Sequence, residues 1–278
     1  MPFTPAHAVV AVPFARTPLV PAAVAVGAMA PDLPLFVRGT PLSYEVSHTH
    51  VAAAVAVALL LLALWYAVLR PAVRELSPRW LARRLPRGWD ATGVAAWREL
   101  RGARASADGA GLRAAAVADA LVAVSLVVGV LSHIGWDAFT HEGRWGVELV
   151  PALGQQWGPL LGYKWLQYGS GVLGVVVLAV CAAVWLRRRP VGAAERVLPD
   201  AVRIAWWVSL PVILAGAWVS GILAHGPLRE DFTAAHLGYL VLPPACALWG
   251  LLSVALAIVV QVRRRAASVV DVVTRADG

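Results

Sequence analysis

The chain has 278 residues, of which 59% are hydrophobic and only 14% are charged, and its mean hydropathy is +0.69. This composition excludes an ordinary soluble globular protein and indicates a polytopic membrane protein. We therefore expect the lipid bilayer as a partner. The formal net charge of +8 is typical of basic connections beside spanning helices. No segment interleaves basic and aromatic residues as a nucleic-acid surface would, so we expect no nucleic-acid partner.

The N-terminal segment is apolar but interrupted. The stretch 18–30 is too short to cross a membrane, is broken by Pro21, and is followed by the prolines Pro31 and Pro34. We expect residues 1–42 to form a re-entrant helical hairpin that packs into the bundle, and a sixth full crossing is the alternative. The first residues lack a basic region followed by an apolar core, so we expect no cleavable signal peptide.

Five further stretches approach the ~20 apolar residues that a spanning helix needs. They are residues 51–69, 112–134, 171–186, 202–224 and 238–260. The predicted fold is therefore all-α: a polytopic integral membrane helical bundle with about five spanning helices plus the N-terminal hairpin. We expect a single membrane domain, 1–278, composed of an N-terminal part (1–50), a five-span bundle (51–260) and a tail (261–278).

The arginines predict the orientation of these spans. Ten lie in residues 70–113, five in 187–203 and four after residue 260, so basic residues concentrate on alternate connections. By the positive-inside rule these connections are cytoplasmic. We therefore expect a multi-pass protein of the inner (plasma) membrane, with a basic cytoplasmic tail at 261–278. We also expect a basic cytoplasmic linker at 70–113 that is partly helical near residues 90–100 and otherwise loose.

The strongest candidate site is the run from His133 to His141, in which His133, Asp137 and His141 are spaced four residues apart. On a continuous helix each four-residue step turns the side chain by about 40°, so all three share one face. Two imidazoles and a carboxylate on one face are what Zn²⁺ or a similar divalent ion requires. A polar border where a helix leaves the membrane is the alternative, but it leaves the shared face unexplained.

Two more histidines, His48 and His50, come just before the first span. Residues two apart do not share a helix face, so both can converge only if Ser47–His50 is a loop or the first turn of the helix, with Ser47 or Thr49 as N-cap. We expect at least one of the pair to be a metal ligand or a catalytic residue. An interfacial polar collar is the alternative.

Two residues of the N-terminal hairpin are further candidate ligands. Asp32 lies in a rigid Pro-Asp-Leu-Pro turn, where a carboxylate suits a ligand or bridging oxygen, although capping of the following backbone is the simpler reading. His7 follows Thr4 and Pro5, a good helix start with Thr4 as N-cap, which places the imidazole in the first turn as a ligand or a supporting residue.

The last outward loop carries the candidates for substrate binding: Arg229, His225 and His236. If the substrate contains a phosphate, Arg229 and one of these histidines are suited to hold it. An ordinary solvated turn, in which Arg229 pairs with a neighbouring acid, is the alternative.

Four segments, MPFTPAH (1–7), GAMAPDLP (27–34), SHTH (47–50) and LSHIGWDAFTH (131–141), together resemble the bacterial membrane family DUF4184. They are similar, more distantly, to the YdjM-type membrane-bound metal-dependent hydrolases, which are grouped with zinc phospholipase C and P1 nuclease folds. The resemblance implies metal-dependent hydrolysis of phosphoesters.

These signals together predict a membrane-bound metal-dependent hydrolase acting on phosphoesters such as lipid headgroups at the extracytoplasmic face. We expect one or two divalent ions, with Zn²⁺ preferred, and catalysis by Asp137 and His141. The expected ligands are His48 or His50, His133, Asp137, His141, Asp32 and His7. The alternatives are a membrane transporter, or a metal-binding structural membrane protein without catalysis.

Overall fold

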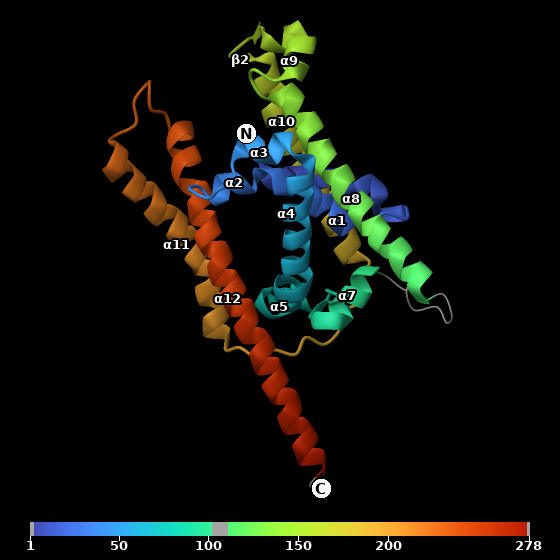
Figure 1. Cartoon of the computed structure of the whole chain (residues 1–278). Helices are drawn as coiled ribbons and strands as arrows, with labels where there is room; N and C mark the ends of the chain where they lie inside the picture. Colours follow the sequence, from blue (N-terminus) through green and yellow to red (C-terminus); the bar gives the residue numbers. More distant parts are fainter. Residues whose placement is uncertain (1–2, 102–110, 277–278) are drawn as a thin grey trace. The chain divides into compact units, whose positions relative to one another are not determined.

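The computed structural model describes residues 3–101 and 111–276, which are almost entirely helical (Figure 1). Five helical stretches in this part of the chain are long and apolar enough to cross a membrane, and they confirm the five predicted spans. They are Val51–Leu76, Arg113–Thr140, Gly162–Arg187, Asp200–His225 and Ala234–Ala267. The third begins well before its predicted start, because residues expected in the preceding loop extend the helix by more than two turns.

The N-terminal segment forms short helices rather than a span. They are the 3₁₀-helical η1 (Thr4–Arg16), α1 (Pro21–Met29), η2 (Ala30–Asp32) and α2 (Leu33–Phe36). Pro21 starts α1 instead of breaking it, because a proline in the first turn removes an N–H that has no helical partner anyway. Helix α1 packs against η1, and the apolar stretch Pro21–Phe36 is shorter than the five spans.

The chain divides into two compact units that interleave in sequence. The first unit comprises Met1–Pro34, Pro41–Ala63 and Trp97–Arg188, and the second comprises Leu35–Thr40, Leu64–Ala96 and Arg189–Gly278. Our expectation that residues 1–278 form a single membrane domain stays a prediction.

In the first unit, α1 lies directly against α8 (Gly111–Thr140), as Figure 1 shows. A Cβ added at Gly27 would come 2.5 Å from the carbonyl oxygen of Leu126, and one at Gly129 would come 2.3 Å from that of Val24. The two backbones therefore touch, and only glycine fits at either position. Small residues at such contacts let membrane helices approach closely and pack well.

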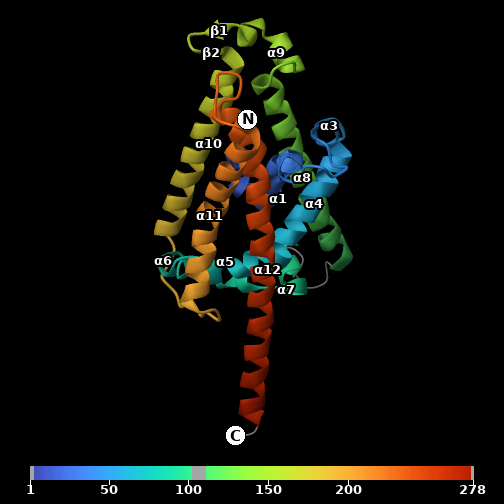
Figure 2. The same cartoon turned by 90° about the vertical axis from the view of Figure 1, so that its left-hand side faces the viewer.

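Near one end of α8, short elements lead to α10 (Gly162–Arg187), as Figure 2 shows. They are α9 (Trp145–Leu149), η6 (Pro151–Gly154), and the two-residue strands β1 (Gln156–Trp157) and β2 (Leu160–Leu161). The strands pair antiparallel, with Trp157 opposite Leu160, and Gly158 supplies the positive φ of 68° that their turn needs. Helix α10 also packs on η1, where Gly174 faces the backbone of Ala6.

The segment before the first long span forms a separate short helix, α3 (Tyr44–Thr49), followed by α4 (Val51–Leu64). Helix α4 continues through a π-helical turn, η3 (Trp65–Leu69), into α5 (Arg70–Leu76). Three short helices follow: α6 (Arg79–Ala82), η4 (Arg87–Asp90) and α7 (Gly93–Arg101).

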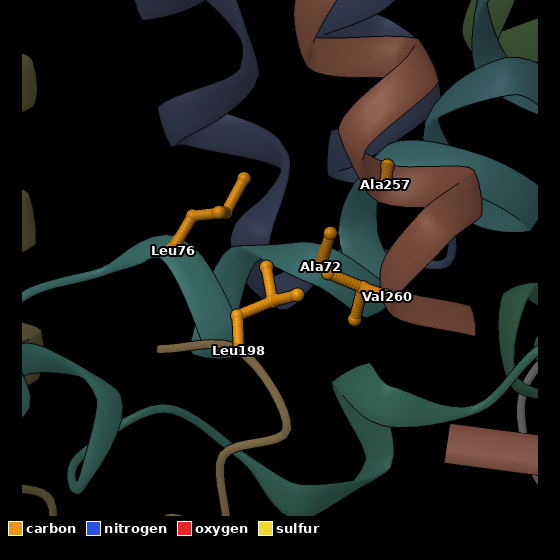
Figure 3. Packing of buried hydrophobic residues seen from close by; sticks show 5 residues of the cluster. All are labelled: Ala72, Leu76, Leu198, Ala257 and Val260. Carbon is orange, nitrogen blue, oxygen red and sulfur yellow. The ribbon is translucent and has the colours of Figure 1, made fainter. Parts of the chain in front are cut away.

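In the second unit, α11 (Asp200–His225) and α12 (Ala234–Ala276) pack against each other. A buried apolar cluster joins α5, α12 and the segment before α11 (Figure 3); its members are Ala72, Leu76, Leu198, Ala257 and Val260. Beside it, the fully buried carboxylate of Glu75 accepts hydrogen bonds from the backbone N–H groups of Val197 and Leu198 and from the Arg203 guanidinium.

The helix expected near residues 90–100 is present as α7, but the expectation that the rest of the linker is loose is wrong for residues 70–90, which are largely helical. They contribute Ala72, Leu76 and Glu75 to this buried region. The arginines that suggested a solvated stretch are partly buried here: Arg74 donates to Asp90 and to the carbonyl of Ala193. Residues 102–110 lie outside the described part of the chain.

Substituting Gly129 by alanine should destabilise the first unit, because the new methyl group would overlap the Val24 carbonyl oxygen. Overpacking of this kind costs about 1–3 kcal/mol. We expect Gly129→Ala to lower the midpoint of thermal unfolding in detergent. Gly135→Ala on the same helix is the matched control, since a Cβ there meets no heavy atom within 4 Å. Equal midpoints for the two variants would contradict the close contact.

Candidate metal centre

Helix α8 carries the two central residues of the site. Because the helix continues to Thr140, His133 and Asp137 lie one turn apart on the face that presents Gly129 to α1. His133 Nδ1 is 2.7 Å from the carbonyl oxygen of Ala28, to which it donates as the Nδ1–H tautomer. This hydrogen bond directs the lone pair of Nε2 towards the carboxylate of Asp137, 3.5 Å away.

His48 reaches the same place from α3. The N-cap of this helix is Ser43, whose hydroxyl accepts a hydrogen bond from the Val46 N–H, so the prediction that Ser47 or Thr49 caps a helix here is wrong. His48 Nδ1 lies 2.8 Å from the Tyr44 carbonyl oxygen, and Nε2 lies 3.6 Å from Asp137 Oδ2. Both His48 and His133 therefore bind a carbonyl through Nδ1 and present Nε2, an arrangement typical of metal-binding imidazoles.

Asp32 enters from η2. Its carboxylate accepts a 2.6 Å hydrogen bond from the Thr4 hydroxyl, while Oδ1 is 3.8 Å from His133 Nε2. The role predicted for Thr4 was wrong, since η1 begins at Thr4 with Phe3 as N-cap and the Thr4 hydroxyl goes to Asp32 instead. Ser47 ties α3 to this turn by donating to the Pro31 carbonyl oxygen at 2.8 Å.

Asp32, His48, His133 and Asp137 each offer a ligand atom within 4.8 Å of the others, and all four are buried. Their Nε2 and carboxylate oxygen atoms could therefore hold a metal ion. Nε2 of His7, His48 and His133 and Oδ1 of Asp137 are buried and have no hydrogen-bond partner among the described residues. Buried polar atoms are rarely left without a hydrogen-bond partner, so four such atoms in one place require an explanation.

His7 stands beside these four residues. Its ring lies next to that of His133, tilted by 34° with centroids 4.1 Å apart, and its Nε2 is 3.8 Å from Asp137 Oδ1. Burial lowers the pKa of His7 to about 4, with the neighbouring His133 adding to the effect. The ring is therefore neutral at pH 7, which leaves the Nε2 lone pair able to bind a cation.

His141 lies at the edge of the site. Its Nδ1 is 3.4 Å from Asp137 Oδ2, and its Nε2 accepts a hydrogen bond from the amide of Gln167 at 3.1 Å. The side chain is 19% exposed, more than the residues of the buried group. Burial also lowers the pKa of His141. This imidazole is thus neutral and next to the carboxylate, in a position to exchange a proton.

Tyr44 completes the surroundings of Asp137. Its hydroxyl donates to Asp137 Oδ2 at 3.2 Å, and its ring stacks on His48 with centroids 3.8 Å apart. Burial raises the pKa of the Tyr44 hydroxyl, with the negative charge of Asp137 adding to the effect, so the hydroxyl remains a donor.

The other predicted site residues do not belong to the buried group. His50 follows α3, is exposed, and contacts the Thr49 hydroxyl. His225, Arg229 and His236 are exposed residues of the second unit, around the connection between α11 and α12. Arg229 pairs with Asp231 at 3.4 Å, and His236 Nδ1 accepts from the Thr233 N–H. Their role in substrate binding stays a prediction.

Three residues of the site escaped the sequence-based reasoning: Thr4, Tyr44 and Gln167. Gln167 was missed because the third span was expected to begin at residue 171, which placed Gln167 in the preceding loop. In the structure α10 begins at Gly162, and the Gln167 side chain is buried. Tyr44 is four residues before His48, and this spacing on a helix was the signal that could have revealed it.

Comparison with known proteins assigns the family but no activity. No curated protein and no solved structure matches the chain, and no named relative links it to the YdjM-type hydrolases. Residues 1–260 match the family described as "Domain of unknown function (DUF4184)". This match covers all the residues of the candidate centre and nearly the whole sequence, and the chain therefore belongs to the DUF4184 family.

Proposed function

We propose that this protein is a membrane-bound metal-dependent hydrolase that cleaves phosphoesters, with lipid headgroups as the substrate class. The observation that carries the proposal is the convergence of unpaired buried ligand atoms from His7, His48, His133 and Asp137. A buried polar atom without a partner costs about 1–3 kcal/mol. Four such atoms in one place are explained if they bind a cation together.

Zinc suits this donor set best. Imidazole nitrogens with a carboxylate oxygen are typical zinc ligands, whereas Mg²⁺ and Ca²⁺ prefer oxygen throughout. Asp32, His48, His133 and Asp137 would hold one ion, and His7 would serve as a further ligand. When bound, zinc acts as a Lewis acid and lowers the pKa of a coordinated water towards ~7.

We assign the proton transfers to His141 and the orientation of Asp137 to Tyr44. Hydrolysis adds water across a P–O bond, so one proton must pass from that water to the leaving oxygen. His141 is neutral, partly exposed and within 3.4 Å of Asp137, which suits it to take up and return this proton. Tyr44 keeps the Asp137 carboxylate in place through its hydroxyl.

The proposal also includes the membrane side and the phosphate contact. The distribution of arginines favours a centre on the extracytoplasmic side and a cytoplasmic C-terminus. Arg229, with His225 or His236, stays our candidate for holding a substrate phosphate, because a planar guanidinium matches phosphate oxygens in pairs.

A metal-binding structural protein without catalysis is the second candidate, and burial favours it. Asp32 is 2% and His133 is 0% exposed, and closed sites are typical of structural zinc. A transporter has less support, because the one group of ligating residues found in the described part of the chain gathers near the end of α8 rather than along several spans.

Replacing His48 should remove the metal, whereas replacing the neighbouring His50 should not. We expect His48→Ala to weaken binding by more than the roughly 10- to 100-fold that losing an outer-shell partner costs, because a ligand itself is lost. His50→Ala, an exposed residue two positions away, is the matched control. Metal content of purified protein by mass spectrometry is the measurement. Full metal content in both His48→Ala and a His133→Ala, Asp137→Ala double variant would refute the assigned ligands.

A measurement of turnover should distinguish the proposed hydrolase from a structural metal-binding protein. Metal-loaded protein in detergent is expected to hydrolyse a phosphodiester, and a chelator should abolish this activity. His141→Gln should keep its metal but lower kcat by about 10²–10⁴-fold, the usual contribution of a general acid–base group. Metal-loaded wild-type protein that hydrolyses neither soluble nor lipid phosphoesters would support the structural role instead.

The orientation can be tested with reporter fusions. A periplasm-active phosphatase fused after Gly158, in the turn between β1 and β2, should be active, whereas a fusion after Arg87 should be inactive. The reverse pattern would place the candidate centre on the cytoplasmic side.

A further inference from the structure

A groove of about 440 Å³ opens between η1, α8 and α10 of the first unit. This volume is within the range of small-molecule pockets in proteins. Val9 and Val10 of η1 form one wall, Trp136 of α8 a second, and Leu173 and Val177 of α10 a third. Its lining is thus nearly all hydrocarbon.

The groove adjoins the candidate metal centre through His7. His7 lines the groove and also presents Nε2 to Asp137 at 3.8 Å. The few polar groups of the lining are at the same level of α8 and α10: Trp136 Nε1 donates to the Ser170 hydroxyl at 3.1 Å, and Ser132 lies one turn before Trp136. The groove is therefore an apolar surface that shares one residue, His7, with the candidate metal centre.

The surroundings of the groove indicate which kind of molecule would bind in it. Helices α8 and α10 are two of the five stretches long enough to cross a membrane, and Leu173, at the groove wall, is 63% exposed on the surface of α10. In a bilayer the medium that contacts such a surface is lipid acyl chain. A water-soluble phosphoester would gain nothing from these walls, whereas an acyl chain would fill them.

We propose that this groove binds one acyl chain of a membrane lipid and so presents the phosphoester of that lipid to the metal centre. The inference rests on the proposed function for the fate of the headgroup, but the binding of the chain does not depend on turnover. The apolar walls next to His7 would favour a substrate that carries a hydrocarbon chain over a free phosphate ester.

Crosslinking tests the binding directly. Protein in nanodiscs containing a phosphatidylglycerol with a diazirine near the end of one acyl chain is irradiated, and the labelled peptides are mapped by mass spectrometry. We expect adducts in residues 4–16 and 171–177. Val177→Trp should fill the groove and reduce these adducts about tenfold, equivalent to about 1.4 kcal/mol of binding free energy. Val180→Trp, an exposed position one turn further along α10, is the matched control and should label as the wild type does.

A second variant and a second readout keep the test decisive. Ser132→Leu fills the groove from α8 and should act like Val177→Trp, with metal content unchanged in both. Equal labelling of Val177→Trp, Ser132→Leu and Val180→Trp, or labelling confined to other peptides, would overturn the proposal. Labelling of the groove without hydrolysis of any phosphoester would support the binding of an acyl chain and refute the proposed reaction. Equal loss of activity towards a soluble bis(4-nitrophenyl) phosphate and a long-chain lipid in the filled variants would refute selection by the groove.

Discussion

The contact between the backbones of α1 and α8 is the constraint on which the candidate centre depends. Gly27 and Gly129 let the two helices touch, and the next residue after Gly27, Ala28, is the one whose carbonyl binds His133. Gly129, His133 and Asp137 recur every four residues, so the face of α8 that packs on α1 becomes the face that gathers ligand atoms. The same helix contact thus fixes both the packing of the first unit and the direction of the His133 imidazole.

Burial then gives these polar groups their chemical character. A set of imidazoles and carboxylates with no exposed surface is unfavourable unless each atom is satisfied. The outward-directed atoms are satisfied: Nδ1 of His48 and of His133 bind carbonyl oxygens, and Asp32 and Asp137 accept from Thr4 and Tyr44. The Nε2 atoms of His7, His48 and His133, which point into the cluster, have no hydrogen-bond partner among the described residues. The unpaired atoms therefore lie together at one point. This asymmetry distinguishes the cluster from a collar of polar side chains at a membrane interface.

The sequence predicted the all-α class and all five spans, because a run of about 20 apolar residues has few other outcomes. It also predicted that His133 and Asp137 share a face, since a helical spacing of four is sufficient. It could not choose between His48 and His50, because the separate helix α3 and its Ser43 cap decide which imidazole turns inward. Nor could it reveal that residues 70–90 form buried helices, since their arginines find partners such as Asp90 only in the folded chain.

The ligand atoms of the centre all belong to residues 7–137, and the first unit ends at Arg188. Helices α11 and α12 belong to the second unit and are synthesised afterwards. Every residue that could bind a cation at the candidate centre has therefore been synthesised once α8 has left the ribosome. If the centre binds a metal ion, as we propose, the ion can bind before the polypeptide is complete, and it would then link η1, η2 and α3 to α8 while translation continues.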